Sequence, residues 1–153
     1  TIQGSLGVML NKPSSFTLKD VCLDKKMKYL NSSHPVYHGG PVNDSALILL
    51  HTEGWQSKNT AKAQGNLFLT SDNFMLERLA LNDAPANWRL FGGLCGWAPG
   101  QLQAELDGTY PYKKENQWLY AEADNDFIFS LSGEKQWKYA LDISSQQLFD
   151  RYL

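Results

Sequence analysis

This sequence has little of what usually reveals a metal or redox site. It has only two cysteines, Cys22 and Cys95, and they lie too far apart along the chain to form a CxxC motif. Its three histidines give no HExxH motif and no pair spaced four residues apart on a predicted helix. The common zinc and dithiol signatures are therefore excluded, and we expect neither a metal nor a cofactor. Two free thiols are typical of a reducing compartment, so we expect a cytoplasmic protein.

Strong net charge and long apolar runs are also absent. The formal net charge is −2, whereas proteins that bind nucleic acid usually carry a basic face. The one tight basic cluster is Lys25, Lys26 and Lys28, and a solvated helix end or loop explains it. No apolar run approaches the roughly 20 residues that cross a bilayer. We therefore expect neither nucleic acid nor a membrane as the partner, but an unidentified protein or small molecule.

What the chain does have is enough apolar sequence for one packed domain. Hydrophobic residues make up 42% of its 153 residues, and a chain of this length buries roughly 70% of its unfolded surface. Apolar runs and alternation predict strands at residues 5–10, 46–51, 66–70 and 88–94, and a strand pair at 117–121 and 126–130. Turn and cap signals predict helices at residues 17–21, 72–81, 101–106 and 133–141, and a final helix from Ser144. Strands and helices interleave irregularly, which favours an α+β fold over a doubly wound sheet.

Several of the predicted helix ends carry recognisable caps. Thr17 and Asp20 form a capping-box pattern, and Ser71 or Asp72 is the expected N-cap of the next helix. Gly108 is the expected end of the helix at 101–106, because glycine adopts the left-handed conformation at helix ends.

The C-terminal region is expected to contain two separate helices. In the first, Trp137, Ala140 and Leu141 are predicted to face inward, because their spacing places them on one side of a helix. Ser144 and Gln147 match a capping box, which predicts the start of the second helix.

The most distinctive segment is residues 92–100, in which several glycines surround Trp97. Pro99 suits the first turn of a helix, and the free N–H groups of such a turn favour an anion. Lys12 and Arg89 are candidates to supply positive charge there. The spacing matches neither a P-loop nor a GxGxxG fingerprint. A tight corner packed by Trp97 explains the same glycines without any ligand.

Three stretches together resemble the bacterial AlgH/YqgE family. They are residues 4–13 (GSLGVMLNKP), residues 39–42 (GGPV) with His51 beyond, and residues 89–102 (RLFGGLCGWAPGQL) with Glu105 beyond. The resemblance covers nearly the whole chain, which implies a single AlgH/YqgE-like domain over residues 1–153 that begins a strand or two later than the family does. It further implies a mixed, strongly coiled sheet or small barrel surrounded by helices, in a cytoplasmic bacterial protein.

Few residues of the chain are candidates for chemistry. Cys95 beside a glycine-rich turn has the setting of a nucleophile, with His38 or His51 as its base. The family has alanine at this position, however, which favours a small buried hydrophobe. For His51 a structural hydrogen bond to the backbone is the default interpretation. Gln101 and Glu105 lie four residues apart and offer a carboxylate with an orienting amide, although an exposed polar helix face explains them equally well. We predict no catalytic residue.

Three functions remain open. We favour a non-enzymatic binding or regulatory protein, because turn formers, amides and aromatics dominate the family-like residues. Its expected ligand or partner surface comprises Asn11, Lys12, Pro13, Gly39, Gly40, Pro41, His51, Gly96, Trp97, Gln101 and Glu105. The second possibility is an enzyme acting on a small anionic or acyl substrate, which requires Lys12, His51 and Glu105 to converge in one pocket. The third is a direct DNA-binding transcriptional regulator, a label that some family members carry, but no helix-turn-helix pattern supports it.

Overall fold

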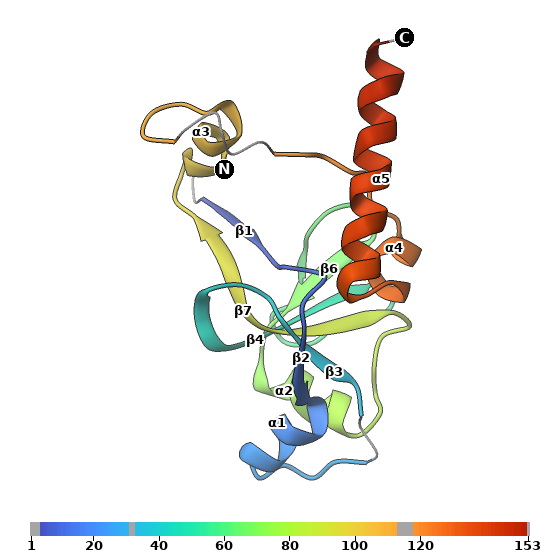
Figure 1. The fold of residues 1–153 in the computed structure, drawn as a ribbon. Helices are drawn as coiled ribbons and strands as arrows, with labels where there is room; N and C mark the ends of the chain where they lie inside the picture. Colours follow the sequence, from blue (N-terminus) through green and yellow to red (C-terminus); the bar gives the residue numbers. More distant parts are fainter. Residues whose placement is uncertain (1–3, 31–32, 113–117, 153) are drawn as a thin grey trace.

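The computed structural model describes residues 4–30, 33–112 and 118–152 (Figure 1). The strands within these ranges are β1 (Ser5–Gly7), β2 (Pro13–Thr17), β3 (Pro35–His38), β4 (Val42–Thr52), β5 (Ala61–Lys62), β6 (Leu67–Thr70) and β7 (Trp88–Trp97). The helices are α1 (Leu18–Asp24), α2 (Asn73–Ala80), α3 (Gln101–Asp107), α4 (Asn125–Ser130) and α5 (Gly133–Tyr152). None of the helices in these ranges combines the length and the apolar character that a membrane span requires.

The strands form one mixed sheet in the order β2-β3-β7-β4-β6-β5. The long strand β7 lies inside it, paired antiparallel with β4 and parallel with β3. Further along, β7 pairs antiparallel with β1 through residues 95–97. The sheet remains open, so the predicted α+β fold with a mixed sheet is confirmed, and the small-barrel alternative is not adopted.

Adjacent residues of the central strands contribute to two separate hydrophobic clusters. Leu90 packs with Cys22 of α1 and Leu79 of α2, whereas the next residue, Phe91, packs with Phe127 of α4. This division follows from the strand geometry, since successive side chains point to opposite faces of a sheet. Helices therefore cover both faces: α1 and α2 lie against one face, and α4 and the start of α5 lie against the other (Figure 1).

The predicted caps at the first three helices are confirmed. The Thr17 side chain accepts a hydrogen bond from the Asp20 amide, and the Asp20 carboxylate accepts one from the Thr17 amide, which completes the capping box of α1. Asp72 caps α2 by accepting from the Met75 amide at 2.7 Å. Gly108 ends α3 with a φ of 63°, a left-handed conformation that glycine adopts without strain.

The strand pair predicted at 117–121 and 126–130 is wrong. Residues 125–130 form the helix α4, and residues 118–121 belong to no helix or strand; residue 117 lies outside the described residues. The Asp124 carboxylate accepts from the Phe127 amide at 2.7 Å and so caps α4. Phe127 and Ile128 are both buried against the sheet. The apolar run at 126–130, which is typical of a strand, therefore forms a short helix here.

The two helices predicted after residue 133 are one continuous helix, α5. Ser144 lies inside it and caps nothing; its hydroxyl donates to the Tyr120 carbonyl oxygen at 2.5 Å. Trp137, predicted to face inward, has 57% of its surface exposed. The neighbouring Gln136 is buried instead, because it hydrogen-bonds to Arg89 of β7 and to the Phe127 carbonyl.

The boundaries of three strands also differ from the prediction: the strand predicted at 46–51 is β4, which starts four residues earlier at Val42. The strand at 5–10 is shorter and ends as β1 at Gly7, because the chain then turns towards residue 39, where the Met9 amide donates to the Gly39 carbonyl. The strand at 88–94 is longer and continues to Trp97, because β1 pairs with its last three residues. The glycine-rich segment is thus largely strand, and only its end turns into α3.

Candidate functional site

The second half of β7 is crossed at close range by Gly39 and Gly40. A Cβ atom on Gly39 would lie 2.3 Å from the Gly93 carbonyl oxygen, and one on Gly40 would lie 2.2 Å from the Leu94 carbonyl carbon. The Gly39 amide donates to the Gly92 carbonyl at 2.8 Å. Only glycine permits two main chains to approach this closely. We call this contact of residues 39–40 with 92–95 the glycine crossing.

The segment around Lys12 is fixed beside this crossing through its main chain. The Lys12 carbonyl accepts from the His38 amide at 2.7 Å, and Pro13 lies opposite Tyr37 in the sheet. The side chains of Lys12, Pro13 and Pro41 remain exposed. The three family-like stretches of the sequence therefore meet in space, and they meet mainly through backbone contacts.

Trp97 connects the end of β7 to α3. Its ring lies on Gly7 of β1, where an added Cβ would be 3.2 Å from the ring. Its Nε1 donates to Glu105 Oε2 at 3.3 Å, and Gln101 Nε2 donates to Glu105 Oε1 at 2.9 Å. Gln101 Oε1 in turn accepts from the Ala98 amide at 2.9 Å. The predicted carboxylate–amide pair therefore exists, and it holds the helix against the strand.

Trp97 also contacts an aromatic residue from a distant part of the chain. The Trp97 and Trp118 rings meet edge-on, with centroids 6.4 Å apart. Trp118, Leu119 and Tyr120 are all exposed, and they line a small pocket together with Leu148 of α5. The sequence pattern missed this surface because residues 118–121 were assigned to a strand, in which alternate side chains would be buried.

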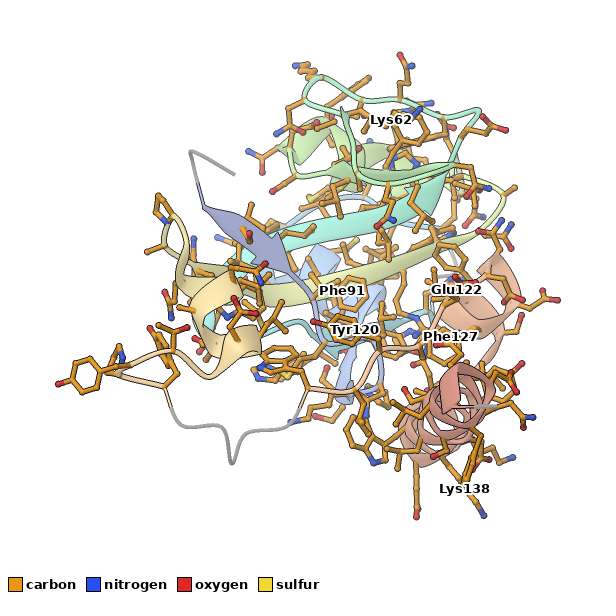
Figure 2. The ribbon with its side chains drawn as sticks, turned by 90° about the horizontal axis from the view of Figure 1, so that it is seen from above. Lys62, Phe91, Tyr120, Glu122, Phe127 and Lys138 are labelled. Carbon is orange, nitrogen blue, oxygen red and sulfur yellow. The ribbon has the colours of Figure 1, made fainter. Side chains whose placement is uncertain are left out.

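The chain around Tyr120 is flanked by open hollows. One groove of about 790 Å³ lies between the turn at residues 64–67 and the segment 120–125, and Glu122 and Asp124 are among its lining residues. Another hollow of about 450 Å³ lies between Tyr120, Glu122 and Asp150 of α5. Figure 2 shows Tyr120 and Glu122 beside α4, which carries Phe127, with Lys138 on the far side of α5 pointing away from the sheet.

His51 is fully buried near the end of β4. Its Nδ1 lies 2.8 Å from the Thr52 carbonyl oxygen, and its Nε2 lies 3.0 Å from Thr70 Oγ1. A carbonyl oxygen only accepts, so Nδ1 carries the proton and Nε2 accepts from the Thr70 hydroxyl. Burial lowers the pKa of His51, although the hydrogen bond to Thr52 opposes this effect. The expected structural bond to the backbone is confirmed, with a neutral ring.

The predicted convergence of Lys12, His51 and Glu105 in one pocket is wrong. His51 pairs opposite Trp88 at the start of β7, whereas Glu105 contacts Trp97 at its end. Nine residues of strand separate those two positions, which corresponds to roughly 30 Å. Lys12 lies between them beside the crossing.

Arg89 does not supply charge to the glycine-rich segment, contrary to the expectation. Its guanidinium is buried and donates from Nη1 to the Leu10 carbonyl at 2.7 Å and to Gln136 Oε1 at 3.1 Å. Nη2 donates to the Leu131 carbonyl at 2.7 Å, and the group lies 4.2 Å from the Tyr37 ring. Burial lowers the pKa of Arg89, yet an arginine stays charged in proteins. This cation joins the N-terminal segment, the sheet and α5.

Within the described part of the chain, neither cysteine hydrogen-bonds to an imidazole. Cys95 is half-buried, and its Sγ lies 3.7 Å from the Gly39 carbonyl, so the thiol packs against the glycine crossing. Cys22 is buried in α1, and burial raises the pKa of its thiol. Within the described ranges, no group of three His, Cys, Asp or Glu side chains is arranged to hold a metal ion.

Comparison with known proteins identifies relatives along nearly the whole chain. A UPF0301 protein of Stenotrophomonas maltophilia is 30% identical over 149 residues, which cover 95% of this chain and 76% of the relative. One from Methylococcus capsulatus is 32% identical over 144 residues, which cover 92% of this chain and 72% of the relative.

Solved structures give the same result. The solution structure of the AlgH protein from Pseudomonas aeruginosa matches with a TM-score of 0.77 and 28% identity, over 94% of this chain and 74% of that one. A crystal structure of a Corynebacterium diphtheriae protein shares the fold, with a TM-score of 0.62 and 21% identity over 90% of this chain and 69% of that one. The family model described as AlgH-like (DUF179) matches residues 1–148, so this chain belongs to the AlgH-like family.

Proposed function

We propose that this chain is a non-enzymatic, cytoplasmic binding protein that recognises a protein partner through an exposed aromatic surface. The surface consists of Trp97, Trp118, Leu119, Tyr120 and Leu148, and we call it the tryptophan surface. The observation that carries the proposal is the position of Trp118, which is 42% exposed yet held against Trp97. Tryptophan and tyrosine are the side chains that most often dominate binding energy at protein interfaces.

The use of the family-like residues also supports binding over catalysis. Gly39 and Gly40 accommodate a main-chain crossing, and Trp97, Gln101 and Glu105 hold α3 against β7. Catalysis needs an acid, a base or a nucleophile converging on one pocket, whereas His51 lies beside Trp88 at the start of β7 and Glu105 contacts Trp97 at its end. The same residues stabilise a scaffold on which a surface can be displayed.

DNA binding receives less support from the same surface. The hollows beside Tyr120 are lined by Glu122, Asp124 and Asp150, and carboxylates repel phosphates. We therefore favour a protein partner over nucleic acid.

The proposal is tested by comparing two aromatic substitutions of equal exposure. Trp118 and Phe74 of α2 are each 42% exposed, and they belong to different parts of the fold. Immobilised wild-type chain, Trp118→Ala and Phe74→Ala are incubated with a bacterial lysate, and captured proteins are quantified by mass spectrometry. We expect a defined set of proteins to be retained by the wild type and by Phe74→Ala, and lost with Trp118→Ala.

Two results would contradict this function. The first is equal capture by wild type and Trp118→Ala. The second is turnover of an acyl or phosphate ester that Glu105→Gln abolishes while circular dichroism shows an intact fold, because Glu105 would then be an acid or base of an active site.

A further inference from the structure

We infer that the partner presents a basic, amphipathic polypeptide segment, which lies along α5 with its apolar side on the tryptophan surface and its Lys or Arg side chains over the neighbouring carboxylates. This inference rests on the proposed function, because it specifies the chemistry of the partner that the same surface binds. Three features of the molecule support it: the apolar pocket of the tryptophan surface beside α5, a row of carboxylates without ion pairs, and the shape of the hollows.

The apolar feature is the pocket of the tryptophan surface together with an exposed ring further along α5. Trp137 and Leu148 are both exposed and lie 11 positions apart, about three helical turns, so they share one side of α5, on which the intervening Ser144 is buried and bonded to the Tyr120 carbonyl. Leu148 lines the pocket formed with Trp118 and Leu119. Exposed apolar surface thus continues from the helix onto the connecting segment.

The charged feature is a concentration of carboxylates next to this pocket. Residues 118–134 contain Glu122, Asp124, Asp126 and Glu134, and the next basic residues along the chain are Lys135 and Lys138 of α5. Within the described part of the chain, none of these four carboxylates forms an ion pair; the ion pair there joins Arg78 to Asp83, away from this region. Clefts lined by one sign of charge attract the opposite charge.

The shape of the surface favours a polypeptide over a small cation. Glu122 lines both hollows beside Tyr120, with Asp124 in one and Asp150 in the other, so the carboxylates extend along the chain instead of converging on one point. The helix α5 spans 20 residues, or roughly 30 Å, and its exposed Trp137 and Leu148 lie roughly 16 Å apart along it. A segment with alternating apolar and basic positions matches both features at once.

A second copy of this chain fits less well. Its exposed basic cluster, formed by Lys25, Lys26 and Lys28, follows α1 on another part of the fold (Figure 1). Contact between that cluster and the acidic surface would be head-to-tail, and such contacts form rings or open filaments instead of closed dimers.

The inference is tested with two defined peptides. Each has about 18 residues, roughly five helical turns, with leucine on one face and either lysine or glutamate on the other. Binding of the fluorescein-labelled peptides to the full chain is measured by fluorescence anisotropy at low salt. We expect the lysine peptide to bind at least about tenfold more tightly than the glutamate peptide. The preference is expected to weaken at about 1 M salt, where screening acts within about 3 Å.

Matched variants locate the binding. The double variant Glu122→Gln/Asp150→Asn is expected to remove most of the preference for lysine, whereas Asp142→Asn, an exposed carboxylate of α5 away from both hollows, retains it. Leu148→Ala is expected to weaken binding of the lysine peptide at least about tenfold. Circular dichroism of each variant establishes that its fold is intact.

Three outcomes would overturn the inference. They are equal affinity for the two peptides, an unchanged preference in the double variant, and self-association in sedimentation that the double variant abolishes, because a second copy would then be the occupant. If the peptides are not distinguished but the Trp118-dependent capture persists, only this inference fails. If the capture also disappears, the proposed function fails with it.

Discussion

The two ends of β7 are stabilised in different ways, although they belong to one strand. At the first end, Arg89 is buried and its guanidinium bonds to carbonyl groups of Leu10 and Leu131 from distant segments. At the second end, Gly39 and Gly40 have no side chains, so their main chain lies directly on the strand. The first end relies on polar side-chain bonds inside the core. The second relies on main-chain proximity, and beyond it Trp118 is exposed while contacting the half-buried Trp97.

This contrast explains why the candidate binding surface lies at the second end. A buried cation tolerates little change, because removing it leaves carbonyl groups without donors. The glycine crossing needs no side chain of its own, so the residues around it are free to form a surface. The following predictions test the contrast, beginning with the largest expected effect.

Arg89→Met is expected to be the most destabilising change. It fills a similar volume but leaves the part-buried Leu10 and Leu131 carbonyls without their donor, and each buried acceptor left unsatisfied costs about 1–3 kcal/mol. Urea unfolding measures the loss. The control is Arg78→Met, because Arg78 forms a partly exposed ion pair with Asp83, and such pairs contribute about 1 kcal/mol or less. Equal effects of the two variants would show that burial of Arg89 is energetically unimportant.

Gly40→Ala is expected to destabilise the other end of the strand by about 1–3 kcal/mol. Its Cβ would lie 2.2 Å from a main-chain atom of Leu94, so one of the two backbones must move. Gly96→Ala is the matched control in the same region, because its nearest neighbour is a flexible Leu94 methyl group at 3.7 Å. Thermal unfolding of both variants distinguishes the crossing from a general preference for glycine. A neutral Gly40→Ala would mean that the close approach is not required.

His51 gives the stability of the first end a pH dependence, because its pKa changes on folding. Burial lowers the pKa of His51 in the folded state, so the unfolded chain takes up a proton first as the pH falls below about 6.5. Stability is therefore retained above that pH and declines below it, until the folded-state pKa is reached. One proton corresponds to a slope of at most about 1.4 kcal/mol per pH unit. Urea unfolding between about pH 7.5 and about pH 5 is expected to show this slope in the wild type and to lose it in His51→Gln.

Local signals predicted the caps of the first three helices, whereas the capping box expected at Ser144 lies inside α5, where Ser144 bonds to the distant Tyr120 carbonyl. The Thr17–Asp20 box and the Asp72 cap are recognisable within four residues, and the structure contains both. The exposure of Trp137 depends instead on Arg89, which lies far away in sequence and draws Gln136 inward. No pattern within residues 133–141 contains that information.

The candidate site was likewise predicted only where its signal is local. The glycines at 39–40 predicted unusual backbone geometry, but their partner, the strand at 92–95, is visible only in the fold. Residues 126–130 have strand-like composition, and the cap at Asp124 with burial of Phe127 and Ile128 favours a helix. With that error, the sequence interpretation placed residues 118–121 in a sheet and so missed the exposed surface.

Trp118→Ala is expected to have the smallest effect on stability and therefore gives the sharpest separation of folding from binding. Trp118 contacts Trp97 only edge-on and is 42% exposed, and an aromatic pair of this kind contributes about 0.5–1.5 kcal/mol. Urea unfolding is expected to show a loss within that range, whereas capture of the partner is lost. Trp97→Ala, in contrast, removes the ring on Gly7 and the bond to Glu105, so it should destabilise the chain more. A Trp118→Ala variant as unstable as Trp97→Ala would mean that both rings belong to the core, and the surface would then not be free to bind a partner.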